Sequence, residues 1–578
     1  QPPFVPRYLR FEVEERMSYK GEVLKALNTT TLKSITRICK EEGVEAIAIC
    51  LLHAYKNPAH EIALAESFQA LLPEVQIITS NRVTREWREY ERTSSTVLSG
   101  YVLPLAKKYL KNLEEKLAAQ GLQNSPYIMQ SNGGITTMND VRENPITMVE
   151  SGPASGVFGA IALGQVIGKK DLIVLDIGGT TAKCALVENG QVKITTNYKI
   201  EHSRTQAGYP IQTPVIDIVE IGNGGGSIAW IDKGGKMHVG PKSAGAIPGP
   251  AAYGRGGKNL TTTDANILTG RIHPDYFLGG EMKPDYSNIE KAAKPLCNQL
   301  KGSQGDIAKG VLSIANANMI NALKLISVNK GHDPRDFTMM VIGGGGAMHG
   351  SDLARELQVP ELIVPPNAGV FSAFGMLMSD IRRDYIRTNV LPLVDNQKDI
   401  LIETFLEMKD TAIQNFEKDG HGKSKIKFTY HADLRYAAQE HYVKVLLSDF
   451  SSDIVLAGII EHFHQEHEKH YSFRLEALVE LVNFHLVAEV AVDKPDFPRL
   501  EATGKAVESA IFDYREVDFD DLGVAQTPFY HRHLLEPDMT FEGPAIIAEK
   551  ATTTVVSPIY KVRVDEYGNL ILTIQKES

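Results

Sequence analysis

Three apolar segments separated by two tight turns follow one another within residues 172–194, LIVLDIGGTTAKCALVENGQVKI. The first turn is Gly-Gly-Thr-Thr and the second is Glu-Asn-Gly. Apolar runs bounded by such turn residues predict a strand, a hairpin turn, a second strand, another turn and a third strand. The first turn is then either an ordinary hairpin turn or a loop that holds the phosphates of a nucleotide.

The Gly-Gly-Thr-Thr turn has the residue types that a phosphate-binding hairpin needs. Gly178 and Gly179 carry no side chain, so backbone N–H groups there can face phosphate oxygens. Thr180 and Thr181 can add hydroxyl donors, and Asp176 at the strand end can hold Mg²⁺ directly or through water. A plain glycine turn explains this stretch alone equally well, so other parts of the chain must decide.

Two further glycine clusters favour the phosphate hypothesis. Glycines are dense within residues 222–257, including Gly224 and Gly225, and we expect backbone there to approach a ligand closely. About 165 residues after Gly178, an apolar strand enters the turn GGGGAMHG. The Gly-Gly-Thr-Thr hairpin and the GGGGAMHG turn together resemble the phosphate and adenosine sites of actin-like and sugar-kinase-like ATPases. In those proteins a later glycine turn packs against adenosine. The resemblance implies that four residues contact the nucleotide: Gly343, Gly344, Gly345 and Gly346.

Two commoner phosphate motifs are absent from the sequence. The nearest approach to a Walker loop, EKDGHGKS at residues 417–424, lacks the first glycine and precedes a strand-like segment. IGNGGGS fails as a dinucleotide fingerprint because Ser227 stands where the last glycine belongs.

Length and composition bound the class of protein. At 578 residues the chain is too long for one core, so several domains are expected. A net charge of −10 argues against a nucleic-acid partner. The four cysteines lie far apart, which indicates neither a disulfide framework nor a zinc knuckle and favours a cytoplasmic location. We find no apolar run of transmembrane length and no signal peptide, so no membrane partner is predicted.

Helix and strand patterns alternate in the first part of the chain. Residues 31–43 and 57–73 have helical spacing. Residues 44–55 and 75–80 are typical of buried strands. The alternation predicts an α/β layer with a parallel sheet, and a long helix follows at residues 95–121.

Ten short segments together resemble the hydantoinase A/5-oxoprolinase family, which contains ATP-dependent hydantoin- and lactam-opening enzymes and subunits of acetone- and acetophenone-type carboxylases. The segments are REYERTSSTVLSGYV, MQSNGG, ESGPASGV, LDIGGTTAK, GYPIQTPVIDIVEIGNGGGSIAWID, VGPKSAGAIPGPAAYGRGG, TTTDANILTGR, GGGGAMHG, DLRYAAQEH and GPAIIAEKATTTVV. The resemblance implies an α/β fold of actin-like (ribonuclease H-like) ATPase lobes with a C-terminal β-rich domain. It also implies a hetero-oligomer with a hydantoinase B-type subunit.

We expect four regions on this basis. They are the remainder of an N-terminal α/β lobe at residues 1–165, the actin-like ATPase domain at 166–390, an α+β segment at 391–500 and a small β domain at 501–578.

The sequence departs from the family pattern in three places. Lys183 stands where many members have an acidic residue, and Ala252 stands where relatives often have a cysteine. Full-length relatives begin with another GGT hairpin upstream of the region that resembles Gln1. We therefore expect that the chain lacks the family's N-terminal segment, and either that Gln1 is not the biological start or that another chain completes the cleft. The short chain is then expected to hydrolyse ATP poorly.

Several charged residues are candidates for the reaction. Asp176 and Lys183 can position phosphates and neutralise their charge. Glu150 precedes a glycine-bounded helix start and can position water, with a solvated charge as the alternative. Asp217 and Glu220 flank a glycine turn and can reach the metal or the substrate, although solvated strand-end carboxylates are equally plausible.

Other residues are better explained by structure. Capping of a short helix accounts for Asp264, with Thr263 as an equal candidate for the cap. His349 is expected to be a structural histidine. We read the histidines of HFHQEHEKHY as structural too, and these are His462, His464, His467 and His470. A solvated, charged helix is favoured over an anion site for Arg85, Arg88 and Arg92.

The first functional hypothesis is an ATP-dependent hydrolase subunit that opens a small cyclic amide by phosphorylating its carbonyl oxygen. ATP and Mg²⁺ are the expected cofactors, with Mn²⁺ as the alternative metal. A ketone carboxylase subunit and a non-catalytic nucleotide-binding subunit remain as alternatives.

Overall fold

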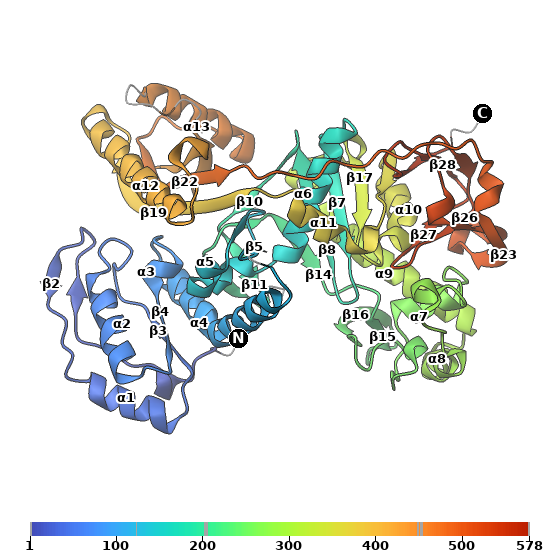
Figure 1. Ribbon diagram of the computed structural model, residues 1–578, viewed down its shortest axis with the longest axis horizontal. Coiled ribbons are helices and arrows are strands. Elements are labelled where there is room, and N and C mark those ends of the chain that lie inside the picture. Colours follow the sequence, from blue (N-terminus) through green and yellow to red (C-terminus); the bar gives the residue numbers. More distant parts are fainter. Residues whose placement is uncertain (1–2, 123, 202–205, 448–449, 451–454, 576–578) are drawn as a thin grey trace. The chain divides into compact units, whose positions relative to one another are not determined.

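The computed structural model describes residues 3–122, 124–201, 206–447, 450 and 455–575. The chain forms two compact units, and each is assembled from segments that are separate in the sequence (Figure 1). Unit 1 consists of Gln1–Ser151, Ile194–Val215 and Asp380–Asp493. Unit 2 consists of Gly152–Lys193, Ile216–Ser379 and Lys494–Ser578.

The first part of unit 1 is the predicted α/β layer. Strands β3 (Ala46–Ile49) and β4 (Gln76–Thr79) pair in parallel, and α2 (Ala59–Leu71) connects them. Helix α1 (Leu32–Glu41) precedes β3, and the long helix α4 (Glu89–Ala119) packs against both strands. The predicted alternation is confirmed, although α4 begins six residues before the expected start at residue 95.

Unit 1 also contains a six-stranded sheet, in the order β21-β20-β22-β19-β6-β5. Its strands are β5 (Tyr127–Met129), β6 (Ile135–Thr137), β19 (Ile381–Pro392), β20 (Ile426–Tyr436), β21 (Val443–Leu446) and β22 (Val479–Val490). Helix α12 (Lys398–Lys418) packs against β19 and β22, and α13 (Leu456–Tyr471) packs against β21.

Unit 2 is built on a nine-stranded sheet in the order β14-β8-β7-β17-β18-β29-β28-β25, with β9 beside β8. Its strands are β7 (Leu172–Ile177), β8 (Ala182–Glu188), β9 (Gln191–Val192), β14 (Ile218–Ile221), β17 (Thr338–Ile342), β18 (Glu361–Val364), β25 (Thr540–Glu542), β28 (Tyr560–Val564) and β29 (Leu570–Ile574). Strand β17 pairs in parallel with β7 and β18, so the carboxyl ends of these three strands share one edge of the sheet.

The C-terminal β-rich part joins this sheet and adds a second one. Strand β29 pairs antiparallel with β18, so the chain end extends the nine-stranded sheet. The second sheet has the order β23-β24-β26-β27. Its strands are β23 (Ile511–Asp518), β24 (Val524–His531), β26 (Ala545–Ala548) and β27 (Thr553–Val556).

Helix α9 (Gln304–Ile326) is a core helix of unit 2. Within the described residues, the helical stretch Gln304–Lys330 is the one segment long and apolar enough to cross a membrane, by length and composition only. No apolar run of this length is expected from the sequence, so this stretch is a difference between the expectation and the structure. In the structure α9 packs against β8 and β14 and buries Val311, Ala315 and Leu323, so its apolar residues serve the core.

Candidate functional site

The Gly-Gly-Thr-Thr turn joins β7 to β8, which confirms the predicted hairpin, and β9 is the predicted third strand. The N–H of Gly178 donates to the carbonyl oxygen of Thr181 at 3.0 Å and closes the turn. Gly179 and Thr180 are exposed, and in the part of the chain that the structure describes their N–H groups donate no hydrogen bond. An added Cβ at Gly179 would meet nothing within 4 Å, so there is open space beside Gly179 for an anion that accepts from these backbone donors.

A second glycine turn, after β14, holds this hairpin in place. The N–H of Gly225 donates to the carbonyl oxygen of Gly178 at 3.1 Å, and that of Gly226 donates to Gly179 at 2.6 Å. A Cβ on Gly224 would lie 2.6 Å from the Gly178 oxygen, so only glycine allows this approach. The structure therefore brings Gly224 and Gly225 to the hairpin as supports, and their contact with nucleotide stays a prediction.

Asp176, Lys183 and Glu220 are cross-strand partners on β7, β8 and β14, so their side chains lie on one face of the sheet. Lys183 Nζ lies 3.4 Å from Glu220 Oε1. Burial raises the pKa of the Asp176 carboxyl, while the Lys183 charge and a hydrogen bond from Ser372 act in the opposite direction. The site thus combines a half-buried carboxylate with a nearby cation.

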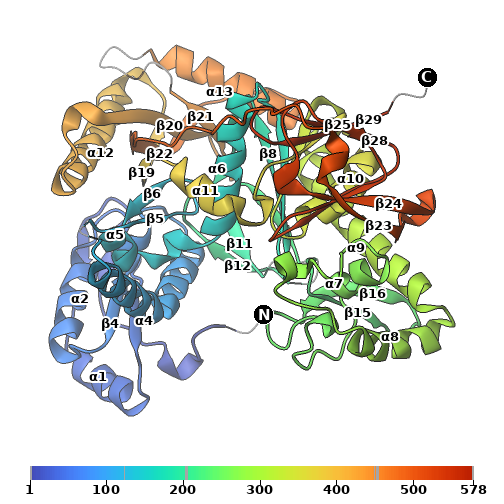
Figure 2. The same ribbon diagram turned by 45° about the vertical axis from the view of Figure 1, so that its right-hand side comes forward.

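A glycine of a neighbouring helix makes room for Ser372, which donates a hydrogen bond to the Asp176 carboxylate. An added Cβ on Gly156 of α6 (Ser151–Val166) would lie 3.0 Å from Ser372 Oγ and 3.7 Å from Asp176 Oδ2. Ser372 lies in α11 (Phe371–Leu377), which runs beside α6 in unit 2 (Figure 2). The glycines of SGPASG signalled Gly156, whereas no sequence pattern indicated Ser372.

The turn after β17 reaches the same carboxylate. Gly343 has φ +79°, and an added Cβ there would lie 2.3 Å from Asp176 Oδ1. The N–H of Gly345 donates to the carbonyl oxygen of Ile177 at 2.8 Å. The structure therefore brings the hairpin and the GGGG turn together at the carboxyl ends of β7 and β17, as expected for ligand sites in such sheets.

Comparison with known families bears on this arrangement. The family model for hydantoinase/oxoprolinase matches residues 92–385, and those for the N-terminal region and the C-terminal domain match residues 1–72 and 394–574. The chain belongs to the hydantoinase/oxoprolinase family. The expectation that it lacks the family's N-terminal region is wrong, because residues 1–72, which contain α1, β3 and α2, match that region.

Relatives of known structure agree with the family assignment. The caprolactamase subunit alpha of Pseudomonas jessenii is 31% identical to this chain. The match covers 98% of this chain and 82% of that subunit. The crystal structure of the ATP-dependent caprolactamase from that organism matches with a TM-score of 0.85 at 30% identity. The match covers 99% of this chain and 83% of the caprolactamase chain. The nucleotide-free structure of acetone carboxylase, an ATP-dependent enzyme, matches with a TM-score of 0.81 at 25% identity. The match covers 100% of this chain and 82% of the carboxylase chain. The hydantoinase/oxoprolinase chain therefore has the actin-like ATPase fold, in a family of ATP-dependent amide hydrolases and carboxylases.

Bulk at Gly344 tests the nucleotide role of the GGGG turn in this family member. The nearest atom to an added Cβ there is the carbonyl oxygen of Ala551, at 3.5 Å, so a valine fits the protein but fills the space beside the turn. We expect Gly344→Val to weaken adenine nucleotide binding about tenfold or more in calorimetric titration. Gly422→Val, at another position with open space, should leave the affinity unchanged. Equal affinities in the two folded variants would place adenosine elsewhere.

Two predicted carboxylates are engaged with other groups. Lys330 Nζ donates to Asp217 Oδ2 at 2.6 Å, so Asp217 forms an ion pair and its metal role stays a prediction. Within the described residues, no group of three or more histidines, cysteines or carboxylates is arranged to hold a metal ion. Glu150 belongs to unit 1 and accepts a hydrogen bond from the Tyr198 hydroxyl at 2.9 Å.

The structural interpretation of Asp264 and His349 is confirmed. Asp264 completes a capping box of α7 (Thr262–Leu268), but the N-cap is Thr261 rather than Asp264 or Thr263. His349 is buried and lies 2.7 Å from Asn316 Oδ1. Burial lowers the pKa of His349 to about 4, which keeps the imidazole neutral.

The histidines of α13 are also structural where they are buried. The Tyr436 hydroxyl lies 2.8 Å from His464 Nδ1. His467 Nδ1 lies 3.0 Å from the carbonyl oxygen of Phe473. Both rings therefore anchor α13 to its neighbours.

The solvated helix expected for the three arginines is wrong for Arg92. Its side chain is fully buried and donates to the Leu51 carbonyl at 2.6 Å and to Ser80 Oγ at 2.9 Å. Arg88 pairs at the surface with Glu440, at 3.4 Å. The burial of Arg92 places one guanidinium nitrogen between the loop after β3 and Ser80, so the side chain joins two segments of unit 1.

Sequence reasoning missed a polar row across the unit 1 sheet. Its cross-strand partners are Lys444, Asp433, Asn483 and Thr388. Asn483 Nδ2 donates to Asp433 Oδ2 at 2.8 Å. Glu86 is buried in the same unit, and burial together with the Asp433 charge raises the pKa of Glu86 to about 8.

Glu86 should make the stability of this family member depend on pH. The ordinary pKa is 4.5 and the folded value is about 8, so between these values the folded state binds more protons than the unfolded state. The free energy of unfolding should therefore fall, by about 2 kcal/mol from about pH 6 to about pH 8. In urea unfolding, Glu86→Gln should flatten this slope, and Glu66→Gln, at an exposed position of α2, should retain it. An unchanged slope in Glu86→Gln would contradict the assignment.

Proposed function

We propose that the chain is the ATP-dependent subunit of an enzyme that opens a cyclic amide, such as a hydantoin, an N-methylhydantoin or a 5-oxoproline-like lactam. The observation that carries the proposal is the hairpin tip, where the N–H groups of Gly179 and Thr180 donate no hydrogen bond within the described residues. Asp176 lies close to this tip, at the carboxyl end of β7. Likeness to an ATP-dependent caprolactamase over almost the whole chain favours an amide substrate.

The proposed reaction begins when the ring carbonyl oxygen attacks the γ-phosphorus of ATP, which forms a C–O–P linkage and releases ADP. Water then adds to the carbonyl carbon, and the ring C–N bond breaks as the nitrogen takes up a proton. The resulting acyl phosphate reacts with a second water to give phosphate and a carboxylic acid. Phosphoryl transfer of this kind depends mainly on positioning and on charge neutralisation.

The residues of unit 2 fit these two requirements. The N–H groups of Gly179 and Thr180 and the hydroxyl of Thr181 would bind phosphate oxygens, and Lys183 would offset their charge. Asp176 would hold Mg²⁺ or Mn²⁺, since Mg²⁺ is commonly bound by one or two carboxylates together with phosphates and water. When bound, the metal neutralises charge on the phosphates.

The remaining predicted residues receive supporting roles in this proposal. Four glycines of the second turn would face adenosine, namely Gly343, Gly344, Gly345 and Gly346. Glu150 would position the attacking water. A hydantoinase B-type subunit would complete a cytoplasmic hetero-oligomer, in line with the subunit names of several relatives.

A ketone carboxylase is the second candidate, because the structural likeness to acetone carboxylase extends over the whole chain. The test is ADP release by the chain co-expressed with its partner, in the presence of hydantoin, N-methylhydantoin, 5-oxoproline, or a ketone with bicarbonate. Stimulation by a cyclic amide supports the proposal. Stimulation by ketone and bicarbonate alone would replace it with the carboxylase.

A further inference from the structure

The glycine turn after β14 holds the hairpin tip by the carbonyl groups of the tip itself. The N–H of Gly225 donates to the carbonyl oxygen of Gly178, and the N–H of Gly226 donates to that of Gly179. The Gly178 carbonyl shares a planar peptide group with the Gly179 N–H, and the Gly179 carbonyl shares one with the Thr180 N–H. Both peptide groups are trans, so in each of them the N–H and the C=O point in opposite directions. The turn therefore fixes the directions of the two N–H groups proposed to bind phosphate.

The turn is itself held in the same way by Thr263. The carbonyl oxygen of Gly225 accepts from both the N–H and the hydroxyl of Thr263, at 2.8 Å and 2.9 Å. This carbonyl shares a peptide group with the Gly226 N–H, so the bonds to the carbonyl set the direction of that N–H. The peptide groups thus form a row that begins at the Thr263 hydroxyl and ends at the Thr180 N–H. Hydrogen-bonded groups aligned in this way also polarise one another.

Helix α7, which carries Thr263, is held firmly at its start. Asp264 is buried and accepts hydrogen bonds from the N–H groups of Thr261, Ala251 and Ala252, at 2.8 Å, 3.2 Å and 2.8 Å. The last two belong to a different segment of unit 2. The first turn of α7 is therefore fixed to its surroundings by several bonds that do not involve the Thr263 hydroxyl.

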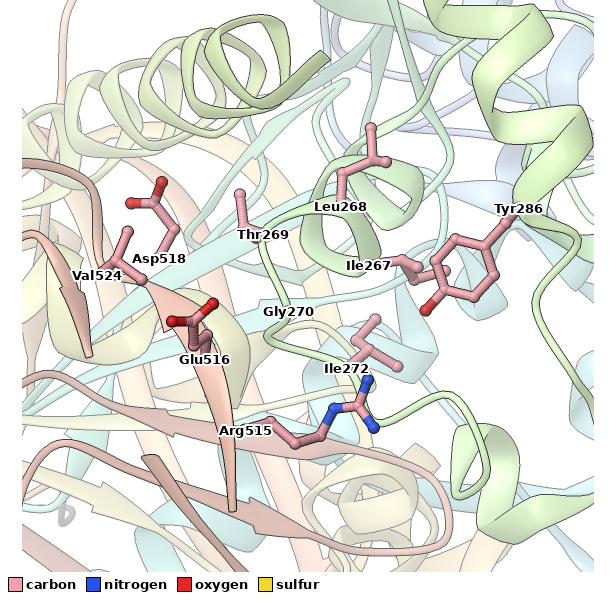
Figure 3. A pocket seen from close by; sticks show the side chains of 10 residues that line it. All are labelled: Ile267, Leu268, Thr269, Gly270, Ile272, Tyr286, Arg515, Glu516, Asp518 and Val524. Atoms are coloured by element: carbon pink, nitrogen blue, oxygen red, sulfur yellow. The ribbon is translucent and has the colours of Figure 1, made fainter. Parts of the chain in front are cut away.

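The other end of α7 packs on β23. The N–H of Asp518 donates to the carbonyl oxygen of Thr269 at 2.9 Å, and an added Cβ on Gly270 would lie 2.6 Å from the carbonyl oxygen of Glu516. Figure 3 shows Thr269 and Gly270 beside Glu516 and Asp518. Because both ends of α7 are held, the Thr263 hydroxyl has a defined position from which to orient the turn.

The fit between the turn and its neighbours leaves no room for side chains on the turn. An added Cβ on Gly225 would lie 2.9 Å from Thr263 Oγ1, and one on Gly224 would lie 2.8 Å from the Thr180 nitrogen. Glycine at position 224 therefore leaves the Thr180 nitrogen uncovered on that side. The backbone N–H of Thr263 already satisfies the Gly225 carbonyl, so the additional hydroxyl mainly restricts the direction of that carbonyl.

We propose that Thr263 is a positioning residue of the phosphate site. Its hydroxyl sets the direction of the Thr180 N–H through two peptide groups, and this N–H donates to a phosphate oxygen of the nucleotide. The assignment rests on the proposed function, because it takes the hairpin to be the polyphosphate site. It does not depend on which carbonyl compound is the second substrate.

Calorimetric titration of the full chain with tripolyphosphate tests this role, because that probe carries phosphates without adenosine. Thr263→Val keeps the size of the side chain and the backbone N–H but removes the hydroxyl. We expect it to bind tripolyphosphate, and a non-hydrolysable ATP analogue, about tenfold more weakly than the parent. Thr263→Ser keeps the hydroxyl and should bind both within about twofold of the parent. The affinity for adenosine should be the same in all three proteins.

Thr262→Val is the matched control. Thr262 is the neighbouring residue of α7 and is 2% exposed, and within the described residues its hydroxyl has no hydrogen-bond partner. This variant should bind tripolyphosphate as the parent does. A merely structural role of Thr263 would reduce the number of binding sites per chain, through loss of folded protein, and leave the dissociation constant unchanged.

Equal dissociation constants for Thr263→Val and Thr262→Val, no recovery in Thr263→Ser, or no binding of tripolyphosphate to the parent would overturn the inference. The outcome is separate from that of the substrate test. Weaker binding by Thr263→Val alongside ADP release stimulated only by ketone and bicarbonate rejects the cyclic amide and retains the role of Thr263. Amide-stimulated ADP release alongside equal dissociation constants rejects only the role of Thr263.

Discussion

Replacing Asp176 with asparagine should lower substrate-stimulated ATP turnover by about 100-fold or more, with the free energy of unfolding nearly unchanged. The carboxylate stands at the carboxyl end of β7, beside the hairpin and the GGGG turn, where its charge can act on the metal. Asparagine keeps the shape and an acceptor for Ser372 but removes the charge. Because burial already raises the pKa of Asp176, loss of the charge costs the fold little.

Asp333→Asn is the matched control for this variant, since Asp333 precedes a short helix, Pro334–Asp336, and pairs with Arg335 of that helix. Steady-state ADP release and urea unfolding should be measured for both proteins with the partner present. If Asp176→Asn binds and hydrolyses ATP as the parent does, the hairpin is not the phosphate site.

The second large effect is expected for Gly375→Ala, which should lower the free energy of unfolding by about 3 kcal/mol or more. An added Cβ on Gly375 would lie 1.8 Å from the carbonyl oxygen of Ser155, so α11 must move away from α6. That movement would also carry Ser372 away from Asp176. The variant should therefore lose turnover as well as stability, as measured by urea unfolding and ADP release.

Gly152→Ala is the matched control, because Gly152 lies in α6 and an added Cβ there would meet nothing within 4 Å. Alanine in a helix is favoured over glycine by about 0.5–1 kcal/mol, so this variant should be slightly more stable than the parent. Similar stabilities for Gly152→Ala and Gly375→Ala would show that the two helices are not in close contact.

Local patterns in the sequence predicted the parts of the site that depend on neighbouring residues. Turn chemistry predicted the β7–β8 hairpin, and hydrophobic patterning predicted β17 before the GGGG turn. The capping pattern near Asp264 was recognised, although the cap lies at Thr261, because several adjacent threonines compete for that position.

Contacts between distant segments could not be predicted in this way. Ser372 reaches Asp176 across almost 200 residues of sequence, and neither stretch contains a signal for the other. Arg92 was expected in solvent because its neighbours are charged, but the carbonyl group that it satisfies belongs to Leu51. The row that includes Asp433 and Asn483 arises only when β20 and β22 pair. Such features depend on the tertiary fold rather than on spacing along the chain.

We propose that ATP is consumed to open a cyclic amide at this site. The most direct measurement is the amount of ADP and of ring-opened product formed together by the co-expressed chain and its partner, with the Asp176→Asn chain alongside. We expect equal amounts of the two products for the parent and little of either for the variant. Ring opening without ADP formation, or full turnover by Asp176→Asn, would contradict it.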